Sequence, residues 1–201
     1  MGKSAKLIIP ILIIIVVVII VVVWFVRIRN NMVGLEEKVN SSWAQVQNQY
    51  QRRFDLIPNL VETVKGFAAQ EKEVLQGVTE ARARAGGVMN LSPDLLNNPQ
   101  AFSQFQQAQA GLGAALQRLL VVVERYPELK SNQNFLTLQA QLEGTENRIA
   151  VERRRFNEEV QAFNRYVRRI PETFVASIFG FQIKNYFQAV TQAEEAPKVE
   201  F

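Results

Sequence analysis

An uncharged apolar segment near the N-terminus, residues 7–26, constrains this chain more than any other feature of its sequence. Most of its residues are Ile or Val, and its only side chain able to form a hydrogen bond is that of Trp24. As an α-helix it would be about 30 Å long, which matches the hydrocarbon core of a bilayer. A lone segment in lipid must satisfy its backbone hydrogen bonds internally, so only a helix is stable there. The sequence therefore predicts a single N-terminal transmembrane helix.

The residues on either side of this segment favour a retained anchor over a cleaved signal peptide. Lys3 and Lys6 form a short basic head, and Trp24 lies beside Arg27 and Arg29, as residues at a membrane interface do. The apolar run is longer than that of a usual signal peptide, and no small-residue cleavage site follows it. Basic residues flank both ends equally, so the orientation rests on the basic head. We expect a signal-anchor topology, with the bulk of the chain on the non-cytoplasmic side.

The composition excludes most catalytic and metal-binding chemistries. The 201 residues include no Cys and no His, which removes thiol nucleophiles, the usual general base and the commonest zinc ligands. The formal net charge of +4 is too small to indicate a nucleic-acid-binding protein. We therefore expect no enzymatic activity, no cofactor, no metal and no nucleic-acid partner, and we assign no catalytic, cofactor-binding or metal-binding residue.

Beyond the apolar segment, apolar residues recur every seven positions, which is typical of amphipathic helices. Two such series begin the pattern: Trp43, Tyr50, Ile57 and Val64, and Val46, Leu60, Phe67 and Val74, with Arg53 as an interruption. They predict a helix from about residue 30 to residue 85 that continues from the anchor and stops at Gly86-Gly87. Pro58 should kink this helix or split it near Ile57. Because Pro58 frees the carbonyl of Phe54, we expect the side chains of Asp55 and Asn59 to satisfy local groups.

Three more helices are predicted after residue 98. The first begins at Asn98-Pro99 and ends at Tyr126, and the last covers residues 171–179 and ends at Gly180. Between them lies the clearest seven-residue series: Phe135, Leu142, Ile149, Phe156, Phe163 and Ile170. The fold class is therefore all-α, with the transmembrane helix followed by an antiparallel bundle of three to four long helices. A single-chain bundle and a coiled-coil oligomer both fit these stripes.

Three groups of side chains are candidates for a functional surface. Arg52-Arg53, residues 153–155 and Arg168-Arg169 could bind anionic lipid or nucleic acid, but the alternation with Glu152 and Glu159 favours a solvated face with ion pairs. An all-carboxylate site would use Glu62, Glu143 and Glu146, although nothing in their spacing selects them. Five aromatic residues close the chain's helical part and either cap the bundle or enter a membrane interface or a partner's groove: Phe174, Phe179, Phe181, Tyr186 and Phe187.

Several longer motifs resemble those of the LemA family of bacterial membrane proteins. They are VNSSWAQV at 39–46, RRFDLIPNLVETVKG at 52–66, YPELKSNQNF at 126–135, LEGTENRIA at 142–150, FN at 156–157 and 163–164, RRIP at 168–171, FGF at 179–181 and APKV at 196–199. The resemblance covers nearly the whole chain. It implies a single-span anchor with an antiparallel helical bundle and no known catalytic site. It also implies the opposite orientation, with a short external N-terminus.

The resemblance further implies a structural role. Members of that family are linked to magnetosome membranes and are encoded beside membrane metallopeptidases. We therefore expect a scaffold in the bacterial cell (inner) membrane that self-assembles or docks partners, with an adaptor or regulator of a membrane peptidase as the alternative. The expected partners are the lipid bilayer, further copies of the chain and a membrane peptidase or other membrane protein. The expected domains are a basic head (1–6), the transmembrane helix (7–26), a LemA-like bundle (27–190) and a flexible acidic tail (191–201).

Overall fold

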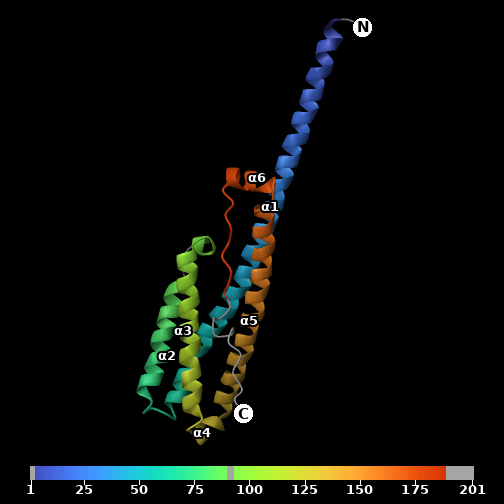
Figure 1. The fold of residues 1–201 in the computed structure, drawn as a ribbon. Helices are drawn as coiled ribbons and strands as arrows, with labels where there is room; N and C mark the ends of the chain where they lie inside the picture. Colours follow the sequence, from blue (N-terminus) through green and yellow to red (C-terminus); the bar gives the residue numbers. More distant parts are fainter. Residues whose placement is uncertain (1–2, 90–92, 189–201) are drawn as a thin grey trace, which may run out of the picture. The chain divides into compact units, whose positions relative to one another are not determined.

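The computed structural model describes residues 3–89 and 93–188, and every regular element in these ranges is helical (Figure 1). The long helices are α1 (Lys3–Lys65), α2 (Lys72–Met89), α3 (Pro99–Val123) and α5 (Gln133–Val167). The short ones are η1 (Pro93–Leu96), α4 (Pro127–Lys130) and α6 (Glu172–Phe179). The all-α prediction is confirmed. The predicted acidic tail at 191–201 lies outside the described residues.

The chain forms two compact units. The smaller one contains Met1–Ser41 and Glu159–Lys184, and the larger one contains Ser42–Glu158 and Asn185–Phe201. Helices α1 and α5 contribute residues to both units because each continues past the boundary. The predicted continuation of the apolar helix into the bundle is thus confirmed, since α1 is one helix of 63 residues.

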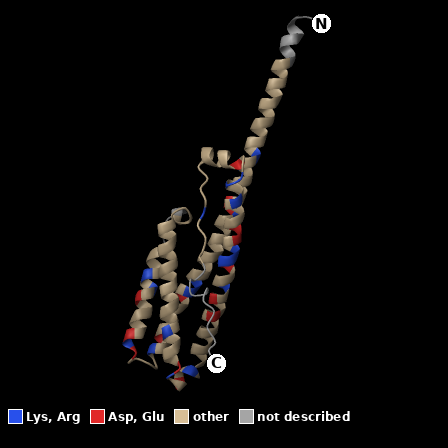
Figure 2. Ribbon diagram, in the orientation of Figure 1, with Lys and Arg blue, Asp and Glu red and all other residues tan. Residues whose placement is uncertain are grey.

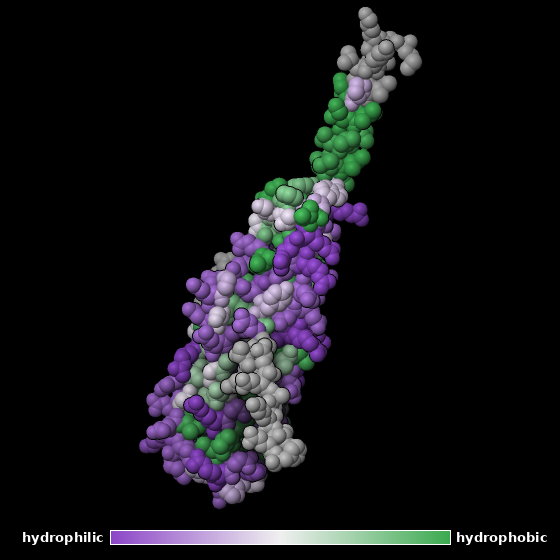
Figure 3. Space-filling model, viewed as in Figure 1, coloured by the Kyte–Doolittle hydropathy of each residue, from purple (hydrophilic) through white to green (hydrophobic). Residues whose placement is uncertain are grey.

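In the smaller unit, the apolar part of α1 is exposed along its described side chains. Figure 2 shows the helix without charge over most of this stretch, and Figure 3 shows its surface as predominantly hydrophobic. It is the one helix among the described residues that is long and apolar enough to cross a membrane. Further along, Asn31 donates from Nδ2 to the hydroxyl of Tyr166 on α5, at 3.2 Å. Within the apolar segment only its last turn meets protein among the described residues, where the Phe25 ring lies 6.0 Å from that of Phe179.

The larger unit is an antiparallel bundle. Trp43 of α1 lies 5.4 Å from Phe156 of α5 between ring centroids, and Arg53 of α1 lies 2.9 Å from Glu146 of α5. Residue numbers rise along α1 while they fall along α5, so the two helices run in opposite directions. Helices α2 and α3 form the second packed pair. The core between them consists of buried side chains on α2 and α3: Leu75, Val78, Ala81, Ala85, Leu112, Leu116, Leu119 and Val123.

Of the two outcomes predicted at Pro58, a kink or a split of the first helix, the split does not occur. Helix α1 continues through Pro58 to Lys65, although Pro58 cannot donate to the carbonyl of Phe54. Arg82 of α2 replaces that donor, because its Nε lies 3.2 Å from the carbonyl oxygen of Phe54. The Arg82 guanidinium also stacks on the Phe54 ring, 3.7 Å from its centroid. The partner of the freed carbonyl is therefore a distant arginine rather than Asp55 or Asn59.

The first helical pattern breaks at a different place from the one predicted. The chain turns between Lys65 and Lys72, where the amides of Phe67 and Ala68 both donate to the carbonyl of Val64. Phe67 is consequently exposed instead of continuing the apolar series. The expected stop at Gly86-Gly87 is also wrong, because α2 runs through both glycines. The Phe54 ring lies 3.0 Å from where a Cβ of Gly86 would be, so this glycine serves close packing rather than helix termination.

The later helix boundaries follow the predicted signals. The Asn98 side chain caps α3 by accepting from the amides of Gln100 and Ala101 at 3.0 and 3.1 Å. Gly180 ends α6 with a φ of 74°, a left-handed conformation that suits glycine, and its amide donates to Ala176. One member of the third series is misassigned. Ile170 is 81% exposed, because α5 ends at Val167 and the helical periodicity ends with it.

Candidate functional site

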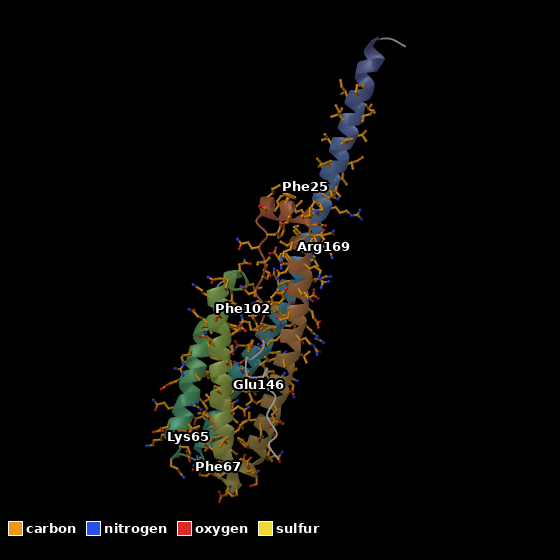
Figure 4. The ribbon with its side chains drawn as sticks, in the orientation of Figure 1. Phe25, Lys65, Phe67, Phe102, Glu146 and Arg169 are labelled. Carbon is orange, nitrogen blue, oxygen red and sulfur yellow. The ribbon has the colours of Figure 1, made fainter. Side chains whose placement is uncertain are left out.

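A buried arginine organises the interior of the larger unit. Arg53 lies midway between Val46 and Leu60, where it interrupts the seven-residue series of apolar residues, and it is only 3% exposed. Its Nη1 donates to both carboxylate oxygens of Glu146 at 2.9 and 3.2 Å, and its Nη2 donates to the side-chain oxygen of Gln109. We call these three side chains the Arg53 centre. Figure 4 labels Glu146 on α5. The centre joins α1, α3 and α5.

The Arg53 centre contains one ion pair, between Arg53 and Glu146. A buried guanidinium without an anion would be strongly destabilising, and Glu146 supplies the anion from a partly exposed position. Tyr50 lies beneath the guanidinium, with its ring centroid 5.1 Å from the Arg53 Cζ. Burial raises the pKa of the Tyr50 hydroxyl, while the positive charges of Arg153 and Arg53 lower it in part. Arg53 Nε and Gln109 Nε2 are buried donors without a protein acceptor among the described residues.

A groove of about 480 Å³ lies beside the centre, between α3 and α5. Its apolar lining comes from Leu116, Leu120 and Leu142. Its polar lining includes Glu143, Glu146 and Asn147 on α5. The volume is within the usual range for ligand pockets, about 300–1,000 Å³. An apolar floor with an acidic side could accept an apolar or basic segment of a partner.

The structure does not assemble the three candidate carboxylates into one site. Glu143 and Glu146 line the groove, but Glu146 is paired with Arg53 and Glu143 accepts from Gln139 at 2.9 Å. Glu62 lies elsewhere on α1, where it pairs with Lys65 at 3.4 Å. Across residues 3–89 and 93–188, no group of three or more Asp, Glu, His or Cys side chains is placed to hold a metal ion.

The basic clusters are divided between the interior and the surface. Arg53 is buried, whereas its neighbour Arg52 is exposed. Arg155 pairs with Glu152 at 2.8 Å, as the alternating charges predicted. Arg153 instead lies over the ring of Phe187, with its Cζ 4.5 Å from the centroid. The residues 153–155 therefore do not present one continuous basic surface.

Two asparagines of α5 bind the backbone of the segment that follows α6. We call this segment, residues 181–188, the strap; it contains no regular element. In the smaller unit, Asn164 accepts from the Lys184 amide at 2.8 Å and donates to its carbonyl at 2.9 Å. In the larger unit, Asn157 accepts from the Phe187 amide at 2.9 Å and donates to its carbonyl at 3.0 Å. Each asparagine imitates the pairing of a β-strand neighbour.

The five aromatic residues near the end of the helical part serve different purposes. Phe187 is buried and packs on Phe102, Phe156 and Trp43, with ring centroids 5.1, 5.5 and 6.0 Å away. It completes the core, as the capping alternative predicted. Phe174, however, is 65% exposed. Phe179 is also largely exposed, although one side of its ring meets Phe25 of α1.

The family model named "LemA family" matches residues 42–201. The chain belongs to the LemA family. The matched range includes every side chain of the Arg53 centre and both strap-binding asparagines, whereas the apolar segment of this LemA-family protein precedes it. The resemblance drawn from the sequence motifs is therefore confirmed.

Several relatives of this LemA-family chain carry names of their own. Magnetosome protein MamQ of Magnetospirillum gryphiswaldense is 28% identical over 173 residues, covering 79% of this chain and 64% of that protein. Magnetosome protein MamQ 2 of Paramagnetospirillum magneticum is 26% identical over 178 residues, with the same coverage. Protein LemA of Metamycoplasma hominis is 21% identical over 176 residues, covering 88% of this chain and 74% of that protein. The match thus spans less than two thirds of the length of the magnetosome relatives.

Sequence reasoning missed the most connected residues of the LemA bundle. The sequence patterns present Arg53 as a break in an apolar series and as part of a surface basic cluster, not as a buried cation, and they do not select Gln109. The two asparagines were noticed only as parts of the repeated Phe-Asn motif, at 156–157 and 163–164. The seven-residue spacing of that motif was the available signal, since it places both asparagines on the same side of α5.

Proposed function

We propose that this LemA-family membrane protein is a non-catalytic, membrane-anchored scaffold that self-assembles and docks partners at the bacterial cell membrane. The observation that carries the proposal is the continuity of α1. One helix of 63 residues begins with an exposed apolar segment and ends with side chains such as Ile57 and Leu60 in the bundle core. A bundle that shares one helix with its anchor is suited to holding partners at the membrane.

The charged side chains of the larger unit support a structural rather than a catalytic role. Arg53, its buried cation, is neutralised by Glu146, and the nearby Glu143 is engaged by Gln139. The magnetosome names of the MamQ relatives add support for a role in membrane organisation.

Self-assembly is the first interaction that we expect. The Gln-rich exposed positions of α1 and α3, including Gln51, Gln107 and Gln117, offer uncharged hydrogen-bonding contacts that do not repel an identical copy. Anchoring also confines the protomers to two dimensions and raises their effective concentration, much as a linker does.

Cross-linking in intact membranes, followed by mild detergent extraction and mass spectrometry, tests this proposal. We expect a ladder of cross-linked copies and co-purification of the chain with itself. A different protein recovered in stoichiometric amount, without self-cross-links, would contradict self-assembly.

That contrary result would support the second candidate function, an adaptor or regulator of a membrane peptidase. The groove beside the Arg53 centre favours it, because an apolar floor flanked by Glu143 and Asn147 can accept a segment of a second protein. The extraction experiment separates the two functions, since the peptidase would be the recovered partner.

We further propose that the bundle lies on the non-cytoplasmic side. The short basic head containing Lys3 and Lys6 supports this orientation. Protease added to spheroplasts should degrade the bundle, while complete protection until the cells are lysed would reverse the assignment.

A further inference from the structure

An unpartnered apolar face lies on the smaller unit at the level where the apolar segment of α1 ends. Its residues are Ile170, Phe174 and Ile178, which are 81%, 65% and 67% exposed. Phe174 and Ile178 are four positions apart on α6, so they share one side of this helix. Together with the exposed part of Phe179 they form what we call the α6 face. Isolated exposed apolar residues are ordinary, but a group of four large ones between Ile170 and Phe179 marks a candidate interaction surface.

The contacts of α6 fix its level along α1. The ring of Phe179 lies 6.0 Å from that of Phe25, and the Cζ of Arg29 lies 5.2 Å from the Phe179 centroid. Phe25 belongs to the last turn of the apolar segment, and Arg29 follows its end. Figure 1 shows α6 lying across α1 at this point, and Figure 4 labels Phe25 beside it. The α6 face is therefore level with Trp24 and Arg27, where a bilayer interface would lie.

The two sides of α6 differ as those of an interfacial helix do. Val175 and Ala176 are buried against the protein, whereas Phe174 and Ile178 face away from it. Exposed Arg168 and Arg169 precede the helix, and exposed Arg27 lies on α1. Positive side chains around an apolar face complement anionic phosphate headgroups over an acyl region.

We propose that the α6 face inserts into the interfacial region of the bilayer that α1 spans. The membrane then holds the smaller unit at two elements, the spanning segment of α1 and the flat-lying helix α6. A second element resists rotation of α1 about its own axis and tilting of α1 in the bilayer. This inference rests on the anchor in the proposed function, but not on self-assembly.

Single-cysteine labelling of the full-length protein tests the inference, because the chain has no cysteine of its own. Ile178→Cys carries a nitroxide on the α6 face, Ile15→Cys carries one in the spanning segment, and Gln161→Cys carries one at an exposed position of α5 in the same unit. The proteins are reconstituted in nanodiscs of phosphatidylethanolamine and phosphatidylglycerol. The ratio of collision with lipid-soluble oxygen to collision with a water-soluble nickel chelate reports the depth of each label.

We expect a ratio at position 178 several-fold above that at 161 and below that at 15. A ratio at 178 equal to that at 161, with a high ratio at 15, would overturn the inference and leave the anchor intact. Protection of position 178 from both reagents would overturn it in favour of a protein that covers α6. A low ratio at 15 would instead refute the anchor itself. Phe174→Cys provides a second position on the same face, should Ile178→Cys fail to give a folded protein.

Discussion

At the scale of single residues, the larger unit depends on one buried charge, that of Arg53. Arg53 makes its hydrogen bonds to groups 56 and 93 positions away, so it ties together helices that are distant in sequence. A buried ion pair adds little stability compared with well-packed apolar residues, but losing one partner is costly. The Arg53 centre therefore specifies which faces of α1, α3 and α5 meet.

Glu146→Gln should destabilise the protein by about 1–3 kcal/mol, because it leaves the buried Arg53 guanidinium without an anion. Glu143→Gln is the matched control, since Glu143 lines the same groove but accepts its hydrogen bond from Gln139 of the same helix rather than from Arg53. Urea unfolding of the detergent-solubilised protein, followed by circular dichroism, measures both. Equal effects of the two substitutions would contradict a structural role for the Arg53–Glu146 pair.

Tyr50 should make the stability of the bundle decrease at alkaline pH. Burial raises the pKa of its hydroxyl above the ordinary value of 10.0, although Arg153 and Arg53 oppose the shift. Above pH 10.0 the unfolded chain loses a proton that the folded protein retains. The stability contribution of Tyr50 is therefore fully present below pH 10.0 and decreases as the pH rises through the raised pKa.

Tyr50→Phe should make the loss of stability above pH 10.0 less steep, while Tyr186→Phe at an exposed position serves as the control. Urea midpoints measured across the alkaline range test this. An identical alkaline decline in Tyr50→Phe and the unmodified protein would show that the tyrosine is not the responsible group.

At the scale of elements, the strap is held by side chains rather than by regular structure. Asn164 and Asn157 each bind the amide and the carbonyl of one strap residue, and Phe187 places its ring in the aromatic core. Lys184 adds an ion pair to Glu36 of α1 at 2.7 Å. The extended segment thereby gains the backbone partners that a helix or sheet would otherwise supply.

Asn157→Ala should release the part of the strap around Phe187. It removes two hydrogen bonds to partly buried backbone groups, at a cost of about 1–3 kcal/mol. Hydrogen exchange should accelerate in peptides covering residues 185–188, while Asn147→Ala at an exposed position of the same helix leaves them unchanged. Unchanged exchange in Asn157→Ala would mean that the segment is held without Asn157, by the Phe187 ring and by the hydrogen bonds of Asn185 to Leu96 and of Gln188 to Gln106.

The helices were largely predictable from the sequence, but their interruptions were not. Seven-residue series identified the buried faces of α1 and α5, because packing imposes the periodicity that the sequence displays. The helix at Pro58 survives through Arg82, which is 28 positions from Phe54, and no local pattern reveals that partner. Likewise, Arg53 looks like a mere interruption of its apolar series in the sequence, and its role becomes visible only when the fold brings Glu146 and Gln109 beside it. Long-range polar contacts are the part of the site that periodicity does not encode.

At the scale of the whole molecule, the chain combines an apolar exposed helix with a charged helical bundle. The apolar segment makes almost no contact with protein, so water is an unfavourable surrounding for it. The bundle core, by contrast, is complete without it, with its own buried aromatic and aliphatic residues. The apolar segment therefore favours lipid as its surroundings, whereas the charged bundle favours water.

Removing residues 1–26 should yield a soluble and predominantly helical protein. The exposed Ile and Val side chains are lost, while the buried core of the larger unit is kept. Fractionation after expression, followed by far-ultraviolet circular dichroism, checks both properties. Full-length protein in the soluble fraction, or substantial strand content in the shortened one, would contradict the division into anchor and bundle.

We propose that this protein is a scaffold that associates with itself at the membrane. Light scattering on the detergent-solubilised full-length protein, with the detergent mass subtracted, measures the protomer number directly. We expect a defined oligomer of the full-length protein and weaker association of the protein lacking residues 1–26, because anchoring aligns the protomers and raises their effective concentration. A monomer in both samples would contradict self-assembly and leave the adaptor as the better account.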